Sequence, residues 1–315
     1  MAALVKKETI DWKSYEAKAV MRGKLMLCIS PEIARSWYVA YDKDSKRQSG
    51  GQLRYTERCM EDVMTLKYLF GIAYRHLEGF LQGLLALAGL DLPAPDRSTI
   101  NYRANRMHFR LPKLVNPKAG YVVSIDSTGL KIHGQGEWNR KKHQQKDHTH
   151  WVKMHIAVDH ESMQILSVES TANDVQDPEV FDTLIKGLPH TPGTVMGDGA
   201  YDTFAAYERS LADGFNLVTP PRDNAVVHSN SKLAHVQLRN KHVAYFLEKG
   251  IYAWAAKNDY WQRNRVETTM SRYVTTFGDR MSSRTVQAQK NEIVIKCRIL
   301  NEFMAANGVY NDSAA

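Results

Sequence analysis

The sequence predicts a mixed α/β fold, and three observations support this class. Before residue 112, apolar residues recur at helical spacing, whereas after residue 118 short β-branched runs alternate with helical patterns. Pro112 and Pro117 mark the change. A hydrophobic content of 43% with 24% charged residues is that of an ordinary globular protein. We therefore expect a helical region over residues 1–115 and an α/β domain over residues 118–307.

The helical region should contain three helices between residues 56 and 107. Thr56 can cap the first helix, and the second spans Tyr74–Leu87. Two prolines within residues 91–96 then interrupt the pattern, because proline cannot continue a helix. Ser98 or Thr99 would cap the third helix.

This third helix is expected to display three arginines, Arg97, Arg103 and Arg106. Three short helices, of which the last bears arginines, suit a helix-turn-helix docked in a DNA major groove. The charge distribution agrees, because residues 1–115 hold 19 Lys and Arg against 12 Asp and Glu, or +7 of the formal +8. A plain helical domain with solvated arginines is the alternative.

The second part of the chain alternates strands and helices in a definite order. Three strands come first, at Tyr121–Asp126, Lys153–Val158 and Ile165–Glu169. Then follow a helix at 177–187, a strand at 194–198, a helix at about 203–212 and a strand at 216–219. After an irregular insertion at about 220–259 come a helix near 260–277 and a terminal helix at about 285–304. This order is that of a ribonuclease-H-like fold with a mixed five-stranded sheet.

Three carboxylates stand where separate elements can bring them together. Asp126 and Asp198 end the first and fourth predicted strands. Glu267 closes a helical segment in which Tyr260, Arg263 and Glu267 share one face. Converging carboxylates make an all-oxygen site for hard divalent cations, and a pair of ions about 3.5–4 Å apart supports phosphoryl chemistry. The triad therefore predicts Mg²⁺-dependent chemistry on nucleic acid, although each aspartate alone could be an ordinary turn cap.

The segment after Asp126 is glycine-punctuated and basic and bears a tryptophan. It is expected to grip a phosphate backbone and stack on a base through Lys131, Trp138, Arg140 and Lys141. A solvated hairpin is the alternative. Six of the twelve histidines lie between residues 133 and 160, but without cysteine pairs or an HExxH motif they predict no zinc site.

The remaining sequence features predict a cytoplasmic protein, nucleoid-associated in a bacterium, with no membrane partner. Three scattered cysteines predict reduced thiols. The first twenty residues lack the apolar core of a signal peptide. The most apolar run, Leu84–Leu90, is too short to span a bilayer.

Eight motifs extend over nearly the whole chain in a fixed order. They are Asp11-Trp12-Lys13-Ser14-Tyr15, Glu78-Gly79-Phe80-Leu81, Asp91-Leu92-Pro93-Ala94-Pro95-Asp96, Asp126-Ser127-Thr128-Gly129-Leu130-Lys131, Gly134-Gln135-Gly136-Glu137-Trp138, Asp198-Gly199-Ala200-Tyr201-Asp202, Pro220-Pro221-Arg222 and Arg265-Val266-Glu267-Thr268. With these motifs the chain resembles a bacterial insertion-sequence transposase of the DDE class. The resemblance is to the family typified by insertion sequence five, and within it to the subgroup typified by insertion sequence nine-hundred-three.

The resemblance implies that Asp126, Asp198 and Glu267 are a catalytic triad holding two Mg²⁺ ions, for which Mn²⁺ substitutes. It also implies that Tyr260 and Arg263 belong to the signature helix and that Arg263 contacts DNA. Members of this family cut at terminal inverted repeats and join the freed 3′ ends to target DNA. The implied partners are these two DNAs and a second copy of the chain.

One position departs from the family signature. The signature places Lys or Arg seven residues after the glutamate, and here that residue is Val274. Two helical turns place it on the face of Glu267, so DNA engagement is expected to be weakened unless Arg272 or another chain compensates. The alternatives to an active transposase are a nuclease of the same fold that only hydrolyses and a catalytically silent, domesticated DNA-binding protein.

Overall fold

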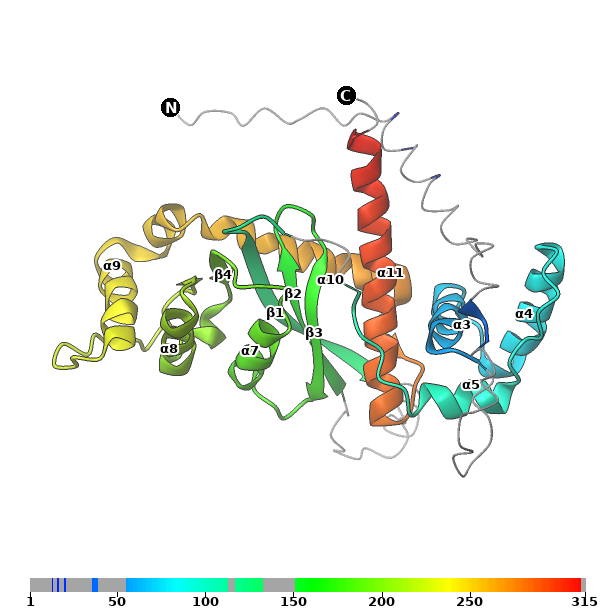
Figure 1. The fold of residues 1–315 in the computed structure, drawn as a ribbon. Coiled ribbons are helices and arrows are strands. Elements are labelled where there is room, and N and C mark those ends of the chain that lie inside the picture. The colour runs from blue at the N-terminus through cyan, green and yellow to red at the C-terminus, as the bar shows by residue number, and fades with distance from the viewer. Residues whose placement is uncertain are drawn as a thin grey trace, which may run out of the picture.

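The computed structural model describes residues 55–112, 117–132 and 151–312, together with positions 13, 16, 20 and 36–38. Side chains are described up to residue 305. A mixed sheet lies at the centre, with the helices of residues 57–104 on one side and those of residues 204–257 on the other (Figure 1). The predicted mixed α/β class is confirmed.

Three helices precede the sheet in the described part of the chain after residue 55: α3 (Glu57–Leu69), α4 (Tyr74–Leu87) and α5 (Arg97–Ala104). Thr56 caps α3 as predicted, since its hydroxyl accepts a hydrogen bond from the Cys59 N–H at 3.0 Å. The predicted cap of α5 is wrong. Asp96 is the N-cap, and its carboxylate accepts from the Thr99 N–H at 2.9 Å and from the hydroxyl groups of Ser98 and Thr99. The two predicted caps therefore act as donors to a stronger acceptor.

The sheet has the order β3-β2-β1-β4-β5. Its strands are β1 (Val122–Ile132), β2 (Trp151–Asp159), β3 (Ile165–Ala172), β4 (Thr194–Met196) and β5 (Asn216–Val218). The first three pair antiparallel, whereas β4 and β5 run parallel to β1. A further strand, β6 (Arg280–Met281), pairs with the far end of β1. It was not predicted, because two residues carry no periodic pattern.

Strand β1 is longer than predicted. It continues past Asp126 to Ile132, because antiparallel pairing with β2 extends to Lys131. The expectation that Asp126 ends its strand is therefore wrong. Its parallel neighbour β4 does end early, and the last pair in their register joins Ser124 to Met196. Asp126 lies two residues after Ser124, and Asp198 lies two residues after Met196.

The later helices are α7 (Asp177–Lys186), α8 (Phe204–Asp213), α9 (Ala234–Lys257), α10 (Asn264–Phe277) and α11 (Val286–Asp312), with the 3-10 turns η1 (Gly199–Tyr201) and η2 (Tyr260–Arg263). The expectation that residues 220–259 are irregular is wrong, since α9 occupies most of them. A kink at Gly250, whose φ is +79°, interrupts the helical period that would have revealed α9. In the segments described, we find no helix whose length and apolarity would let it cross a bilayer.

Both faces of the sheet are covered. On one face, Leu77 and Ile100 of the N-terminal helices share a hydrophobic cluster with Ile156 of β2 and Ile299 of α11. A second cluster joins Ile125 of β1 to α7 and α8. The N-terminal helices and the sheet therefore share one core, and the proposed boundary near residues 115–118 stays a prediction.

A buried ionic cluster fastens α11 to the segment after β6. The Glu292 carboxylate, with no exposed side-chain surface, accepts from Lys296 Nζ at 2.7 Å and from the backbone N–H of Ser282 at 3.0 Å and Ser283 at 2.8 Å. Lys67 of α3 donates to the Ser282 hydroxyl from the other side at 3.4 Å. This cluster therefore joins the N-terminal helices to the end of the chain.

Replacing Glu292 by glutamine is expected to lower the free energy of unfolding by about 3–5 kcal/mol, because a buried Lys296 loses its anion. Urea unfolding measures the change. Glu302→Gln is the matched control on α11, since Glu302 is partly exposed and its partner Arg298 keeps a second carboxylate, Glu61. Equal stability of the two variants would contradict this account.

Candidate acidic active site

Asp126 lies within β1, and Asp198 lies just past the end of the neighbouring strand β4. Parallel strands are about 4.8 Å apart, so the register that ends at Ser124 and Met196 brings Asp126 and Asp198 side by side. The Asp198 carboxylate accepts from the Ala200 N–H at 3.0 Å. Burial raises the pKa of the Asp198 carboxyl above its ordinary value, and the charge of Asp126 raises this pKa further. The two carboxylates are therefore close enough for their charges to repel.

Arg263 joins two of the three predicted carboxylates. Its Nη1 lies 3.0 Å from Oδ2 of Asp126, and its Nη2 lies 2.6 Å from Oε1 of Glu267. The Arg263 side chain is 17% exposed, whereas the Glu267 side chain is 57% exposed. A guanidinium in a partly buried position therefore balances the negative charge of Asp126 and Glu267.

The signature segment is not one continuous α-helix, contrary to prediction. Residues 260–263 form the 3-10 turn η2, which follows Asp259 in the left-handed region at φ +50°, and α10 begins at Asn264. Tyr260 still lies near Arg263, with 6.0 Å between its ring centroid and the guanidinium carbon. Its ring also packs edge-on against the buried Trp254. Burial raises the pKa of Tyr260 to about 12, so its phenol stays protonated.

The two aspartates fit a hard divalent cation, because they are adjacent oxygen donors at one edge of the sheet. Glu267 comes from α10 and is engaged by Arg263. Among the described residues, no group of three or more His, Cys, Asp or Glu side chains is arranged to hold an ion. In this structure Glu267 is therefore paired with Arg263 and does not form such a group with the two aspartates.

Sequence reasoning missed the contacts that dock α10 on the sheet. Arg265 donates to the carbonyl of His160 at the end of β2, and the His160 ring is hydrogen-bonded to the Ser124 hydroxyl of β1. Burial lowers the pKa of His160, which keeps the ring neutral. A histidine just past a predicted strand was the only sequence signal for this role.

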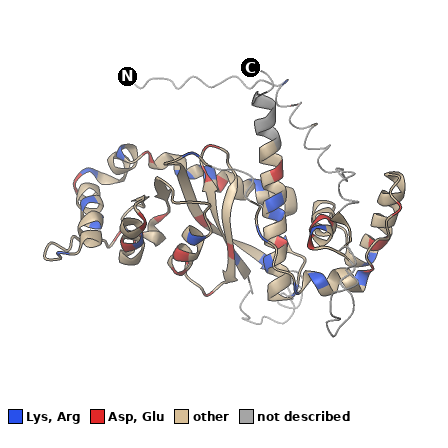
Figure 2. Ribbon diagram, in the orientation of Figure 1, with Lys and Arg blue, Asp and Glu red and all other residues tan. Residues whose placement is uncertain are grey.

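The predicted DNA-contact residues of α5 lie away from the acidic site. Figure 2 shows Lys and Arg along α5, on the opposite side of the sheet from β4, which is labelled in Figure 1. Arg97 and Arg106 are exposed, and Arg106 stacks over the Tyr102 ring at 3.9 Å. The expectation that Arg103 is displayed is wrong. Arg103 is only 8% exposed, because it lies one turn after the buried Ile100. Its guanidinium donates to the Tyr55 carbonyl at 3.1 Å.

The basic loop after β1 is only partly described. Lys131 forms an ion pair with Asp279, at 2.7 Å between Nζ and Oδ2. Trp138, Arg140 and Lys141 lie outside the described residues. On α10, Val274 is 39% exposed, and Arg272 contacts the sulfur of Met304 on α11. The structure therefore leaves a hydrophobic surface at the position where the signature has a cation.

Comparison with models of known protein families identifies the same type of domain, a transposase DDE domain, in two parts of the chain. Two family models, each described as a transposase DDE domain, match residues 117–301 and 20–135. Among solved structures, the chain is similar to a piggyBac transposase synaptic complex with hairpin DNA, at 12% identity and a TM-score of 0.43, over 93% of this chain and 76% of that chain.

Two further structures have lower TM-scores. A simian T-cell lymphotropic virus intasome in complex with PP2A regulatory subunit B56 gamma shares 13% identity at a TM-score of 0.25, over 66% of this chain and 64% of that chain. A Drosophila P element transposase strand transfer complex shares 9% identity at a TM-score of 0.27, over 92% of this chain and 86% of that chain.

The bridging position of Arg263 predicts that it competes with a cation for the carboxylates. Arg263→Gln removes the positive charge between Asp126 and Glu267, so we expect the DNA-free protein to bind Mn²⁺ about tenfold more tightly. Electron paramagnetic resonance of free Mn²⁺ measures this affinity. Arg58→Gln on α3, which removes another paired arginine, serves as the control. Unchanged or weaker Mn²⁺ binding by Arg263→Gln would show that Arg263 does not compete.

Proposed function

The chain belongs to the family of transposases with a DDE domain, and from this premise we propose that Asp126, Asp198 and Glu267 are the acidic triad with which it cuts and joins DNA. A transposase is an enzyme of DNA recombination, and enzymes of the DDE class generally depend on a divalent metal ion. The observation that carries the proposal is the register of β1 and β4, because it makes Asp126 and Asp198 neighbours.

A finer classification follows from the motifs and the sheet. We propose that the chain belongs to the insertion-sequence-five family, in the subgroup typified by insertion sequence nine-hundred-three, and the motifs support this proposal. The strand order β3-β2-β1-β4-β5, antiparallel on one side of β1 and parallel on the other, supports a ribonuclease-H-like catalytic domain over residues 118–307. Residues 1–115 would recognise the terminal inverted repeats, with the exposed Arg97 at the start of α5 and the exposed Arg106 just after its end.

We propose that the carboxylates of the site bind metal ions and that its hydrogen-bond donors bind DNA. Asp126 and Asp198 would hold one Mg²⁺ ion, and Glu267 would hold a second once Arg263 has released it. Bound there, the ions would make a water molecule more acidic and stabilise charge on the departing oxygen. Arg263 and the protonated phenol of Tyr260 are donors, so both would hydrogen-bond to a phosphate of the DNA end.

Two displacements at phosphorus then complete the reaction. In the first, the oxygen of water bonds to phosphorus while the bond to the 3′ oxygen of the element's end breaks, which leaves a 3′-hydroxyl. In the second, that 3′ oxygen bonds to a phosphorus of target DNA and a target 3′ oxygen leaves. One phosphodiester bond is made for each one broken in this second step, so it needs no external energy source.

The same proposal specifies partners and place. The DNA partners are the element's inverted repeats and the target, and a homodimer would hold two ends at once. The site of action would be the bacterial cytoplasm at the nucleoid. A catalytically weakened or domesticated DNA-binding protein is the second candidate, favoured by the exposed valine at position 274. A nuclease that only hydrolyses is a third.

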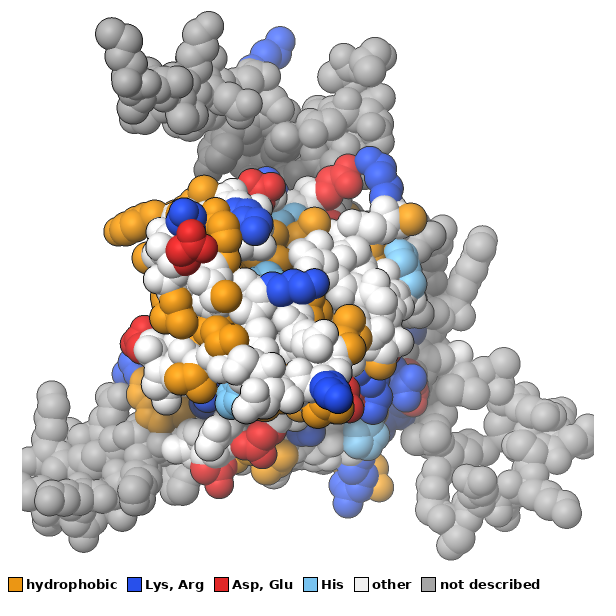
Figure 3. All heavy atoms as spheres, turned by 90° about the vertical axis from the view of Figure 1, so that its left-hand side faces the viewer, with side chains coloured by type: hydrophobic (Ala, Val, Ile, Leu, Met, Phe, Trp, Pro, Cys, Tyr) orange, Lys and Arg blue, Asp and Glu red, His pale blue; other side chains and the backbone are white. Residues whose placement is uncertain are grey.

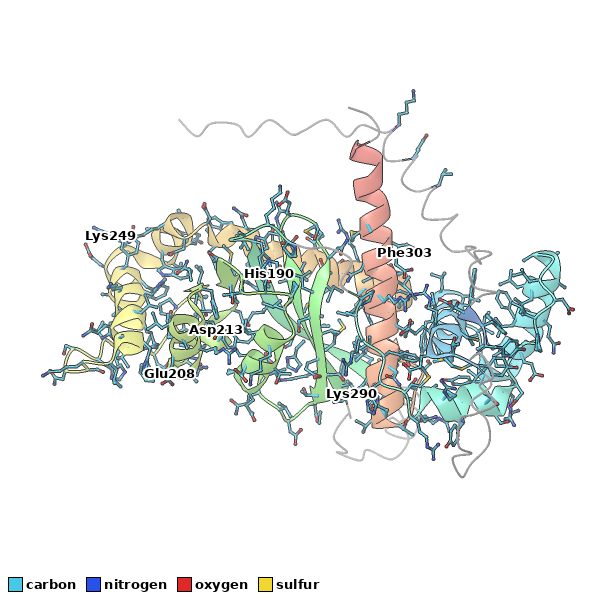
Figure 4. The ribbon with its side chains drawn as sticks, in the orientation of Figure 1. His190, Glu208, Asp213, Lys249, Lys290 and Phe303 are labelled. Carbon is cyan, nitrogen blue, oxygen red and sulfur yellow. The ribbon has the colours of Figure 1, made fainter. Side chains whose placement is uncertain are left out.

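Asp198→Asn tests the triad. The substitution keeps the shape of the side chain but removes its charge, so we expect Mg²⁺-dependent cleavage of end DNA to fall about 1,000-fold or more while binding of end DNA stays within about twofold. Single-turnover cleavage and electrophoretic mobility shift provide the two measurements. Asp213→Asn is the control. Asp213 lies at the end of α8, is labelled in Figure 4, and pairs only with Arg209 among the described ion pairs.

Three outcomes separate the candidate functions. Cleavage by Asp198→Asn at the rate of the unmutated protein would overturn the triad. Failure of the unmutated protein to cut would favour the silent DNA-binding protein. Cutting without any joined product would favour the nuclease.

Val274→Lys tests the missing cation. A lysine two turns after Glu267 should add one phosphate contact, so binding of end DNA should tighten and the slope of log K against log salt should steepen by about 0.9. Leu211→Lys, another exposed hydrophobic position, on α8, is the control for added charge. An unchanged slope and unchanged cleavage would mean that position 274 does not face DNA.

A further inference from the structure

The turn that carries Asp198 is packed closely against the sheet. Strand β4 ends at Met196, and Gly197 still donates its N–H to the Val218 carbonyl of β5 at 3.1 Å. A Cβ atom at Gly197 would lie only 2.7 Å from the ring of Tyr201. Glycine therefore lets the buried Tyr201 ring fit beneath the turn, which fixes η1 directly after Asp198.

The segment after β5 binds this turn through its carbonyl groups. Arg222 Nε donates to the Gly199 carbonyl at 3.1 Å, and its Nη2 donates to the Ala200 carbonyl at 2.7 Å. The Thr219 hydroxyl donates to the carbonyl of Asp198 itself. One exposed guanidinium therefore holds the two peptide groups that follow the catalytic aspartate.

Helix α9 reaches the same turn through a buried ion pair. Arg239 contacts Asp202 with both ends of its guanidinium, Nε to Oδ1 at 2.7 Å and Nη2 to Oδ2 at 2.6 Å. Their side chains are 8% and 0% exposed. Asp202 Oδ2 also accepts the Arg222 N–H at 3.1 Å. Two parallel charge-assisted bonds fix orientation as well as distance, so α9, the turn and the segment after β5 form one rigid unit.

We propose that Arg222 and the Asp202–Arg239 pair are positioning residues for Asp198, and that α9 is the buttress that holds this carboxylate in register with Asp126. The inference rests on the proposed role of Asp198 in metal binding. Arg222 acts through the carbonyl groups of Gly199 and Ala200. The Asp202–Arg239 pair acts through the backbone of Asp202, whose N–H donates to the Gly199 carbonyl at 3.3 Å, so none of the three residues needs to touch DNA or metal. Metal and catalytic groups must be held to within about 0.5 Å, and a displacement of 1 Å can lower a rate about 100-fold.

Arg222 makes the proposal testable without unfolding the protein. The end of the molecule formed by α8 and α9 faces the viewer in Figure 3, where exposed hydrophobic and basic side chains share one surface. Arg222 lines an open hollow beside the turn, with Pro220 and Phe246. An exposed arginine contributes little to global stability, so its loss should loosen the turn and leave the core intact.

The experiment compares Arg222→Met with the unmutated full chain and with Arg209→Met. Arg209 uses its guanidinium in two contacts as Arg222 does, here as ion pairs with Asp182 and Asp213, but it lies on α8 away from the turn. We expect Arg222→Met to bind Mn²⁺ about fivefold more weakly without DNA and to cleave end DNA about tenfold or more slowly. Its melting midpoint should stay within about 2 °C of the unmutated chain. Arg222→Lys keeps one donor and should recover part of both losses.

The readouts separate this inference from the proposed function. If Asp198→Asn binds Mn²⁺ as tightly as the unmutated chain, the proposed metal role of Asp198 fails. If Asp198→Asn weakens Mn²⁺ binding but Arg222→Met behaves like Arg209→Met, the positioning role alone is wrong. If Arg222→Met does not fold, Arg222→Lys is compared with Arg209→Lys instead. Equal Mn²⁺ affinities of these two lysine variants would overturn the proposal.

Discussion

The pairing of β1 with β4 is the constraint on which the candidate site depends. Parallel strands in fixed register bring Asp126 and Asp198 together from positions 72 residues apart in the sequence. A shift of one residue would turn one carboxylate to the other face of the sheet, because side chains alternate along a strand. The hydrophobic cluster that β1 and β4 share with α7 and α8 holds this register, since its members Val123, Ile125 and Val195 are fully buried.

Carboxylates that lie close together repel one another, and an arginine reduces this repulsion in the structure. Like charges at short distance repel, and partial burial strengthens the repulsion. The guanidinium of Arg263 lies between Asp126 and Glu267 and reduces it. The signature segment, made of η2 and the start of α10, therefore supplies both an acidic residue of the proposed triad and a cation that neutralises it, and DNA phosphates are the natural competing partners for that cation.

The rest of the chain is built around this edge of the sheet. The N-terminal helices share a hydrophobic core with Ile156 and other residues of β2 and with α11, so the proposed DNA-recognition region is anchored to the sheet. On the other side, α9 is anchored by the buried contact of Arg239 with Asp202. Segments distant in sequence thus meet at the two ends of one rigid sheet (Figure 1).

The sequence by itself determined the order of strands β1 to β5 with α7 and α8 among them, the cap of α3, the bounds of α4, and which carboxylates are candidates, because periodicity and capping are local. Only the tertiary structure decided that β1 runs past Asp126, that Arg103 is buried, that α9 replaces an irregular insertion and that Arg263 separates Glu267 from the aspartates. Each of these depends on partners far away in the chain, namely β2, Tyr55, Asp202 and Asp126. Local patterns carry no information about such partners, because burial and ion pairing are fixed by packing between elements.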